Sequence, residues 1–534
     1  MTSLLPRGWA TAPINDVIAI QDDGKTIHQG WSPQCEKAPC ANDLDWGVLK
    51  TTSIQSGEFQ HHHHKRLPDV LEPKPAIEVR VGDILLTCAG PRVRCGVACL
   101  VRTTRSRLML SGKMYRFRAV SGATDARYLE SFLQSDPAQI EIDRMKTGGS
   151  DSGLNLTHDR FKHLSVPVAP YREQTRIADK LEELFSDLDA GVAELKAAQK
   201  KLTQYRQSLL KAAVEGALTA EWRKHAQSSE SGAQLLERIL KDRRARWQAK
   251  QLAKFKEQGK APPKDWQDKY PEPVKPDTTD LPPLPEGWVW SSIGQCFYVG
   301  VGATPSRKEP AYWNGDVPWV SSGEVRFDRI VDTKEKISNE GLDNSSTQIN
   351  PVGSVMLGMI GEGKTRGQVA ILDIAAANNQ NCAAIWVTET GIPSEYVYYW
   401  LWSRYDETRR GSSGNNQPAL NKSIVESIPF PLPPRDEAQV IVASMVAALE
   451  QASEQDAAIQ HALKQSTAQR KNILKAAFAG QLVPQDPNDE PASALLARIR
   501  AERAGLAWAK TVKKRVPAPV VDNFGLSHLN PEIA

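Results

Sequence analysis

The chain has 534 residues, of which 40% are hydrophobic and 24% charged, and its formal net charge at pH 7 is +4. This composition is typical of a soluble globular protein. The sequence shows no apolar run of membrane-spanning length and no apolar leader, so we expect a cytoplasmic protein that is neither exported nor inserted into a membrane. Its seven cysteines are scattered without a CxxC pair, which argues against a disulfide framework or a zinc site. The mild net charge does not by itself indicate a nucleic-acid partner.

The first part of the chain, residues 1–167, alternates short β-branched stretches with clusters of Gly, Pro, Asp and Asn. This pattern predicts an α/β globule. From residue 168 to 219 the pattern changes to that of one long helix, with apolar or small residues in steps of four and three. These residues are Ile177, Leu181, Leu184, Leu188, Gly191, Leu195, Ala198, Leu202, Tyr205, Leu209 and Ala212. Such spacing predicts a coiled-coil seam facing a partner helix.

The rest of the chain repeats this order. Residues 220–283 read as a basic helical segment, from Trp222 to Lys264, followed by a stiff proline-rich linker. A second globule is predicted at 284–432, a second coiled-coil helix at 433–484 with a poorer apolar stripe, and a tail at 485–534. One helix of this length needs a mate, and the simplest mate is the other copy packed antiparallel. We therefore predict two α/β domains separated by two long antiparallel helices with pseudo-twofold symmetry.

An internal repeat supports this organisation. LLKAAVEGAL at Leu209 to Leu218 returns 264 residues later as ILKAAFAGQL at Ile473 to Leu482. LPRGW at Leu5 to Trp9 returns as LPEGW at Leu284 to Trp288, and VGDILL from Val81 returns as VGSVML from Val352. In the tail, ALLARIRAER resembles AQLLERILKDR of the basic segment. The repeat is too long for a solenoid, so it indicates a duplicated two-part unit.

One catalytic motif has to be weighed. GMIGEGKT at Gly358 to Thr365 matches the phosphate-binding loop GxxxxGK[ST], and a nucleotide-hydrolysing enzyme built around Lys364 is therefore an alternative. A true loop of this kind opens a helix, whereas here QVAIL follows, which predicts a strand, and the first copy has no GK[ST]. We expect a hairpin tip instead. We find no other credible catalytic constellation or metal site; a coiled-coil scaffold that binds protein through its globules is a further alternative.

Polar, glycine-rich loops recur in both globules. Arg can pair with guanine and Asn or Gln with adenine, while glycines let backbone N–H groups approach phosphates. Each loop alone also fits a solvent-exposed turn. Their recurrence in both copies makes them candidates for DNA contact. The candidate residues are Arg92, Arg94, Lys146, Ser150 and Asn155 in the first globule, and Lys364, Thr365, Arg366, Gln380, Arg410, Ser412, Asn415, Asn416 and Gln417 in the second.

The order of parts, the LPxGW openings, the PYREQ and PRDEAQ helix entries and the LLKAAxEG-type helix endings resemble the specificity subunit of type I restriction-modification systems. The resemblance covers nearly the whole chain. It implies two target recognition domains that read a bipartite double-stranded DNA site, and helices that set the gap. It also implies a chain without catalytic activity or bound cofactor. Two methyltransferase subunits and the restriction subunits would be its partners, and would carry S-adenosylmethionine, ATP and Mg²⁺.

Overall fold

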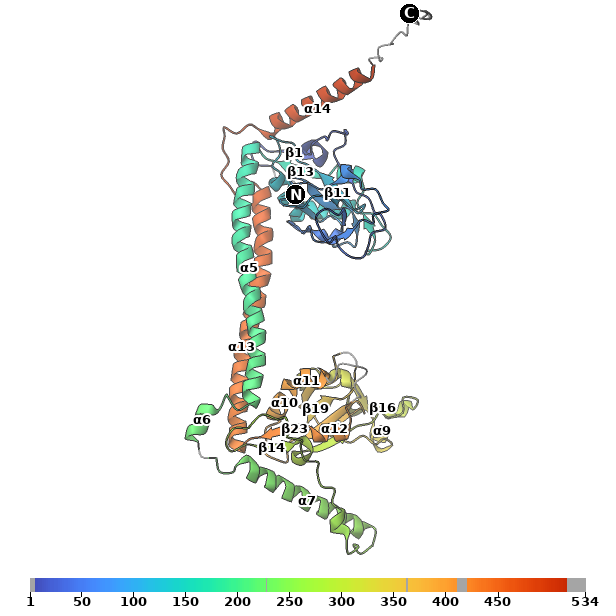
Figure 1. The fold of residues 1–534 in the computed structure, drawn as a ribbon, viewed down its shortest axis with the longest axis vertical. Coiled ribbons are helices and arrows are strands. Elements are labelled where there is room, and N and C mark those ends of the chain that lie inside the picture. The colour runs from blue at the N-terminus through green and yellow to red at the C-terminus, as the bar shows by residue number, and fades with distance from the viewer. Residues whose placement is uncertain (1–4, 227, 362–363, 411–419, 516–534) are drawn as a thin grey trace, which may run out of the picture. The chain divides into compact units, whose positions relative to one another are not determined.

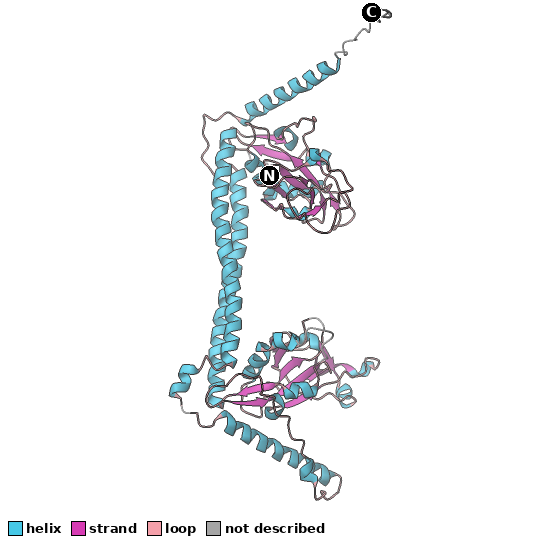
Figure 2. Ribbon diagram, viewed as in Figure 1, coloured by secondary structure: helices cyan, strands magenta, loops and turns pink. Residues whose placement is uncertain are grey.

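A computed structural model describes residues 5–226, 228–361, 364–410 and 420–515, with side chains described up to residue 409 and again from 420 to 505. By contacts the chain divides into two units. Unit 1 comprises residues 1–195 and 461–534, and unit 2 comprises residues 196–460. Each unit thus contains one mixed α/β region and part of each of two long helices, α5 (Tyr171–Val214) and α13 (Arg435–Phe478). Figure 2 shows the strands of each α/β region with helices around them.

The α/β region of unit 1 is built on a four-stranded sheet in the order β2-β11-β7-β9 and a three-stranded sheet in the order β10-β3-β6. The strands are β2 (His28–Gln29), β11 (Met114–Phe117), β7 (Ile84–Thr87), β9 (Ala98–Leu100), β10 (Leu108–Met109), β3 (Gly47–Leu49) and β6 (His64–Arg66). Three further pairs are β1 (Ala10–Pro13) with β13 (Ser165–Val168), β8 (Ala89–Gly90) with β12 (Leu154–Asn155), and β4 (Ile54–Gln55) with β5 (Glu58–Phe59). The helices are α1 (Ile14–Val17), α2 (Ala126–Gln134), α3 (Asp136–Met145), α4 (His158–Phe161) and α14 (Ala492–Arg515).

The α/β region of unit 2 has a five-stranded sheet in the order β15-β22-β19-β20-β17, a three-stranded sheet in the order β18-β16-β21, and the pair β14-β23. The strands are β15 (Tyr298–Val301), β22 (Cys382–Trp386), β19 (Val355–Gly358), β20 (Val369–Leu372), β17 (Asp328–Ile330), β18 (Glu335–Ile337), β16 (Trp313–Val320), β21 (Ala377–Asn378), β14 (Val289–Ser292) and β23 (Pro429–Leu432). The helices are α6 (Ala220–His225), α7 (Gly232–Glu257), α8 (Ile293–Cys296), α9 (Asn339–Asp343), α10 (Ser394–Ser403), α11 (Tyr405–Arg410) and α12 (Lys422–Ser427).

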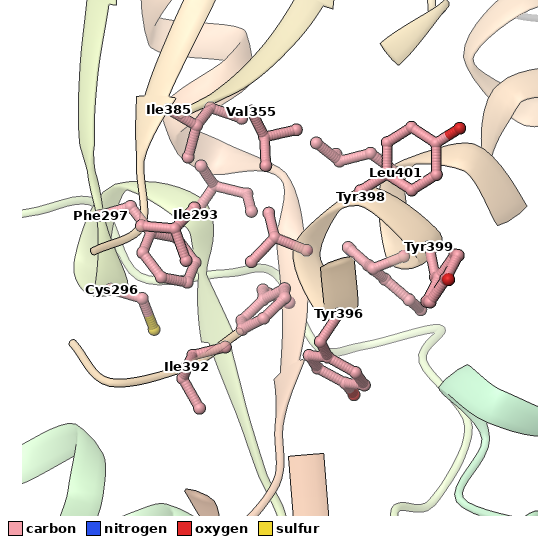
Figure 3. Close-up of a cluster of buried hydrophobic side chains, with 14 of the residues drawn as sticks. Ile293, Cys296, Phe297, Val355, Ile385, Ile392, Tyr396, Tyr398, Tyr399 and Leu401 are labelled. Carbon is pink, nitrogen blue, oxygen red and sulfur yellow. The ribbon is translucent and has the colours of Figure 1, made fainter. Parts of the chain in front are cut away.

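The core of unit 2 lies between its large sheet and α10. Val355 and Ile385 point from the sheet toward Tyr396 and Leu401 of the helix, and Ile293 and Phe297 close the cluster (Figure 3). All six side chains are almost fully buried. The hydrophobic effect on this scale is what holds α10 against the sheet.

The two long helices pair antiparallel in each unit, as the repeat predicts (Figure 1). In unit 1, Ile177 and Leu181 of α5 share a buried cluster with Leu474 and Ala477 of α13. In unit 2, Leu209 and Ala213 of α5 cluster with Ala438, Ile441 and Met445 of α13. The early residues of α5 thus meet the late residues of α13, and the reverse. The predicted fold class, α/β regions with long antiparallel paired helices and an internal repeat, is confirmed.

The predicted seam of α5 is wrong at two positions. Ala198 and Tyr205 are exposed, and Tyr205 keeps 48% of its side chain in solvent. The neighbouring residues face the partner helix instead: Gln199 Nε2 donates to Asp456 Oδ1 at 3.4 Å, and Arg206 Nη2 donates to the carbonyl of Ala452 at 3.1 Å. A helix with 3.6 residues per turn drifts by about 20° per heptad relative to a strict 3.5-residue repeat, so the contacting stripe moves to later positions along the chain.

The basic helical segment predicted from Trp222 to Lys264 contains two separate helices. Helix α6 ends at His225, and α7 starts afresh at Gly232 behind a capping box formed by Ser231 and Gln234. The proline-rich stretch, predicted to be a stiff linker, contacts α7 through Trp266, which stacks on Trp247 with ring centroids 5.9 Å apart. The polar run between the two helices favours a new N-cap over helix continuation.

Candidate nucleic-acid interface

The two globules are joined to the long helices by the same anchor. In unit 1, Gly8 takes a positive φ of +82°, and the indole Nε1 of Trp9 donates to Glu173 Oε1 in the first turn of α5 at 3.1 Å. Tyr128 contacts Trp9 edge-on and its hydroxyl donates to the carbonyl of Pro167 at 2.7 Å. A Cβ-bearing residue would be strained at position 8, which explains the glycine of LPxGW.

Unit 2 has the same anchor, formed by the corresponding glycine, tryptophan, glutamate and tyrosine. Gly287 has a φ of +86°, and Trp288 Nε1 donates to Glu437 Oε2 at 2.9 Å. The hydroxyl of Tyr396 donates to the carbonyl of Pro431 at 2.9 Å. In both units the strand after the tryptophan pairs with the strand before the long helix, β1 with β13 and β14 with β23. The LPxGW motif therefore fastens each globule to its helix, and the tyrosines complete an anchor that the sequence repeat did not reveal.

A further helix docks on each anchor, α7 in unit 2 and α14 in unit 1. The N–H of Gly232 donates to the carbonyl of Gly287 at 2.7 Å, and the N–H of Ala492 donates to the carbonyl of Gly8 at 2.8 Å. Each helix then buries apolar residues of its first turns, Leu235 and Ile239 in α7, and Ala492, Leu495, Leu496 and Ile499 in α14. Arg243 donates to the carbonyls of Gly294 and Phe297, and Arg503 donates to those of Asn15 and Ile18. The weak sequence similarity between the tail and the basic segment thus reflects the same structural role, because α14 and α7 dock on their anchors in the same way.

The candidate loops of unit 1 lie side by side, because β8 pairs with β12. Arg92 Nη1 bonds Asp143 Oδ2 at 2.7 Å, and its Nη2 lies 3.0 Å from Asp151 Oδ1. Lys146 Nζ bonds the carbonyl of Arg92 at 3.0 Å and Asp143 Oδ1 at 2.9 Å. The Lys146 ammonium is the main reason why the pKa of Asp143 is lowered. The structure brings Arg92 and Lys146 together, with their charges balanced by two carboxylates.

The other three candidates of unit 1 have different surroundings. Arg94 turns inward and donates to the carbonyls of Thr51 and Ile54 and to Gln55 Oε1, so it ties its loop to the β4 turn. Ser150 Oγ lies 3.0 Å from Ser152 Oγ in an exposed turn. The side chain of Asn155 is exposed at the end of β12, while its backbone N–H donates to the carbonyl of Thr147 at 2.7 Å. Ser150 and Asn155 are the more accessible groups for a ligand.

In unit 2, three candidates lie in the connection between β19 and β20, which pair antiparallel. The hydroxyl of Tyr405 donates to the carbonyl of Lys364 at 2.7 Å, and the N–H of Gly367 donates to the carbonyl of Gly358 at 2.8 Å. The Nε of Arg366 is buried without a hydrogen-bond partner among the described residues. Thr365 is followed by a turn and then by β20. The expected hairpin is confirmed, and the phosphate-loop alternative is wrong because no helix begins at Thr365.

The remaining candidates of unit 2 are only partly described. Gln380 Oε1 accepts from Thr304 Oγ1 at 2.6 Å on an exposed edge. Arg410 ends α11, but its side chain lies outside the described part of the chain, as do Ser412, Asn415, Asn416 and Gln417. Asn378 opens the NNQN run, residues 378–381, and both Asn378 and Asn350 are buried. Asn350 Nδ2 donates to Asn378 Oδ1 at 2.8 Å, and Trp386 Nε1 donates to Asn350 Oδ1 at 2.9 Å. These bonds hold the NNQN turn in place, since buried polar groups need partners.

Comparisons with known proteins agree with this architecture. Residues 285–465 match the model of the Type I restriction modification DNA specificity domain. The EcoEI type I restriction enzyme specificity subunit of Escherichia coli is 35% identical over 210 residues, which is 39% of this chain and 34% of that subunit. The EcoDI specificity subunit of E. coli is 23% identical over 362 residues, 66% of this chain and 72% of that one. Over these stretches the chain is similar to type I specificity subunits.

A solved chain of a type I restriction-modification system has the same fold as this chain. The two superpose with a TM-score of 0.62 at 17% identity, over 90% of this chain and all of the other. The match with the EcoEI relative spans only about a third of that protein's length. Among the described helices of this chain, none is both long enough and apolar enough to cross a bilayer.

Proposed function

We propose that this chain is the DNA-specificity subunit of a type I restriction-modification complex, with each globule reading one half of a bipartite double-stranded site. The observation that carries the proposal is the anchor built twice, Trp9 on Glu173 and Trp288 on Glu437. Two equivalent globules on paired helices suit a target made of two short segments, because each globule can be oriented in the same way toward one segment.

In this proposal the chain itself is not catalytic. It recruits two methyltransferase subunits and the restriction subunits, and those partners carry S-adenosylmethionine, ATP and Mg²⁺. The connection at Lys364 runs from strand β19 to strand β20 and not into a helix that could hold a nucleotide phosphate. This supports the proposal that catalysis belongs to the partner subunits. The complex is proposed to act in the cytoplasm, where host and foreign DNA meet.

The first test is a domain exchange in the assembled methyltransferase. Residues 1–167 are replaced by the corresponding region of another specificity subunit, and methylated sites are mapped by sequencing genomic DNA. The proposal expects one half of the bipartite motif to change and the other half to persist. Loss of both halves with a folded complex, or a continuous motif, would contradict it. Absence of any DNA affinity in the assembled complex would favour the protein-binding scaffold instead.

The second test concerns the proposed role of the paired helices in setting the gap of the target. Deleting Leu195 to Lys201 from α5 together with residues 454–460 from α13 removes one heptad from each helix and keeps the apolar stripes in phase. Seven residues of helix rise by about 10 Å, close to three base pairs of duplex DNA. The methylated motif should keep both halves with a gap about three base pairs shorter. An unchanged gap would reject this role.

A further inference from the structure

Unit 1 contains a large polar hollow that is separate from the anchor of Trp9, Tyr128 and Glu173. It has a volume of about 1280 Å³ and lies between the loop that follows α1, strands β2 and β11, and α4. The pairing of β2 with β11 places His28 opposite Arg116. Helix α4 adds His158, and Lys162 follows one turn later, its N–H bonded to the His158 carbonyl at 2.9 Å. Residues four apart in a helical turn lie on the same face.

Several polar atoms that line this hollow are buried without a hydrogen-bond partner among the described residues. Arg116 is only 7% exposed, and its Nη1 and Nη2 donate to the carbonyls of Glu78 and Ala76 at 2.5 and 3.2 Å. Its Nε has no partner, and neither do Gln21 Nε2, His28 Nδ1 and His158 Nε2. Buried donors without acceptors are costly and uncommon in folded proteins. Arg116 Nε and Gln21 Nε2 are always donors, and His158 Nε2 is a donor in one tautomer, whereas His28 Nδ1 is an acceptor in the neutral ring because Nε2 faces the Asp23 carboxylate. Unpaired donors gathered in one hollow indicate a ligand rich in acceptor oxygens.

The charge of the lining points the same way. Six lining residues are Lys or Arg, and only Asp22 and Asp23 are acidic. Asp23 is already engaged, since its Oδ2 lies 2.9 Å from His28 Nε2 and 3.9 Å from Lys25 Nζ. Arg118 is paired with Asp83 at 2.6 Å. Within the part of the chain that is described, Lys162 has no ion pair, although its side chain is half-buried. Arg80 Nη2 lies 3.8 Å from Glu78 Oε2, and Arg503 Nη1 lies 4.0 Å from Asp16 Oδ1. Among the described residues, the lining cations left without a carboxylate partner are therefore Lys162 and Arg116.

The electrostatics at His158 support this description. Burial is the largest cause of its lowered pKa, followed by the positive charge of Lys162; Lys25 and His28 act in the same direction, and Asp159 opposes them. The imidazole packs against the ring of Tyr115 with centroids 4.2 Å apart, which holds its Nε2 in one place. An anion bound beside Lys162 would relieve the repulsion among these groups.

Unit 2 shows that the fold does not require such a hollow. Arg243 anchors α7 there as Arg503 anchors α14 in unit 1. The strand at the corresponding place is β15, which pairs with β22. The rings of Tyr298 in β15 and Trp386 in β22 pack together with their centroids 4.6 Å apart. The basic lining is thus an addition to the first globule. If it served only to stabilise the fold, the second globule would be expected to have it as well.

We propose that the hollow of unit 1 is a phosphate-binding site in which Lys162, His158, Gln21 and Arg116 contact the phosphate oxygens. Lys162 supplies the charge, His158 Nε2 and Gln21 Nε2 donate hydrogen bonds, and Arg116 Nε donates from the floor. A volume of this size accepts a free nucleotide or pyrophosphate, or a length of DNA backbone. The DNA source rests on the proposed function, whereas the free-phosphate source does not.

The test uses the full-length chain and two variants of the hollow, Lys162→Glu and His158→Phe. The first reverses an unpaired charge, and the second keeps ring packing on Tyr115 while removing the ring nitrogens. Lys37→Glu is the matched control, because Lys37 is exposed in the same globule and does not line the hollow. Circular dichroism and thermal melting establish that each variant is folded; if His158→Phe fails to fold, the Lys162→Glu and Lys37→Glu pair decides alone.

Two probes distinguish the sources of phosphate. Inorganic pyrophosphate is titrated by calorimetry, and a fluorescent duplex without the bipartite target is titrated by anisotropy at low salt. Pyrophosphate binding that weakens tenfold or more in Lys162→Glu, but not in Lys37→Glu, supports a site for a free phosphorylated ligand. A selective loss of duplex affinity without pyrophosphate binding supports contact with the DNA backbone. If the hollow variants and the control behave alike with both probes, the site does not exist, whatever the outcome of the domain exchange.

Discussion

The two anchors share their geometry but not their charge balance. Glu437 accepts from Trp288 Nε1, from Thr219 Oγ1 at 2.6 Å and from the guanidinium of Arg223, so its buried carboxylate has a cation beside it. Glu173 accepts from Trp9 Nε1, and burial raises its pKa. The same Trp–Glu contact is therefore part of an ion-pair network in unit 2, whereas in unit 1 the carboxylate has hydrogen bonds from Trp9 and Gln485 and the charge of Arg176 nearby, but no direct ion pair among the described residues. Packing was duplicated, while the groups that neutralise the carboxylate differ.

The largest expected effect comes from breaking the ion-pair network of unit 2. Glu437→Ala leaves Arg223 without its carboxylate and Trp288 without an acceptor, and breaking a buried pair of this kind costs about 3–5 kcal/mol. Glu173→Ala removes one acceptor and no ion-pair partner at the same contact, so it should cost about 1–3 kcal/mol. Denaturant unfolding followed by hydrogen exchange, resolved by unit, checks the difference. Equal losses in the two units would contradict the contrast between the anchors.

The docking helices offer a second comparison. Leu235 of α7 and Leu495 of α14 are both completely buried, and truncation of such a side chain to Ala costs about 2–5 kcal/mol. We expect each substitution to increase amide exchange in its own helix and to leave the other helix protected. Substituting Leu252 of α7, which is 46% exposed, should change little and serves as the control. If Leu495→Ala leaves the exchange of α14 unchanged, that helix is not held by the contact described.

A third difference lies one residue after each anchor glutamate. Gln174 donates to the carbonyl of Ala169 at 2.8 Å and accepts from the N–H of Asp125 at 3.0 Å, whereas unit 2 has the fully buried Ala438. Gln174→Ala should destabilise unit 1 by about 1–3 kcal/mol, because buried backbone groups lose their partners. Ala438→Gln should destabilise unit 2 by a similar amount through overpacking. Thermal melts of both variants check this, and a neutral Ala438→Gln would show that unit 2 has room for the amide.

Much of this architecture could be predicted from the sequence, because the features concerned are local or repeated. The LPxGW motifs, the shared helix endings and the spacing of apolar residues from Ile177 predicted the paired helices and the two globules. Tyr128 and Tyr396 were missed because they lie 268 residues apart while the helix repeat has an offset of 264, and no motif surrounds them. The shift of the seam to Gln199 and Arg206 depends on helix geometry accumulated over several heptads.

The candidate contact residues were harder to predict than the fold. Composition marked the polar, glycine-rich loops of unit 1 as candidates, but it could not show that two of them lie side by side or that Arg94 turns inward to the carbonyls of Thr51 and Ile54. The basic hollow was missed entirely, since His28, Arg116 and Lys162 are distant in sequence and meet only through strand register and the position of α4. Side-chain direction in loops is decided by tertiary contacts rather than by residue type.

The smallest expected effect is a pH dependence that separates the two kinds of carboxylate. Burial raises the pKa of Glu173 above its ordinary value of 4.5, so the folded state holds this proton more tightly than the unfolded chain. Its contribution to stability is therefore fully present below pH 4.5 and is lost as the pH rises through the raised pKa. Relative to Glu173→Gln, which does not titrate, the wild type should lose stability as the pH rises from 4 toward neutrality.

Asp143 is the control of opposite sign, because the ammonium of Lys146 lowers its pKa. Relative to Asp143→Asn, the wild type should lose stability as the pH falls below 3.8. Unfolding of both pairs across this pH range measures the two slopes, and slopes of the same sign would mean that burial does not dominate at Glu173.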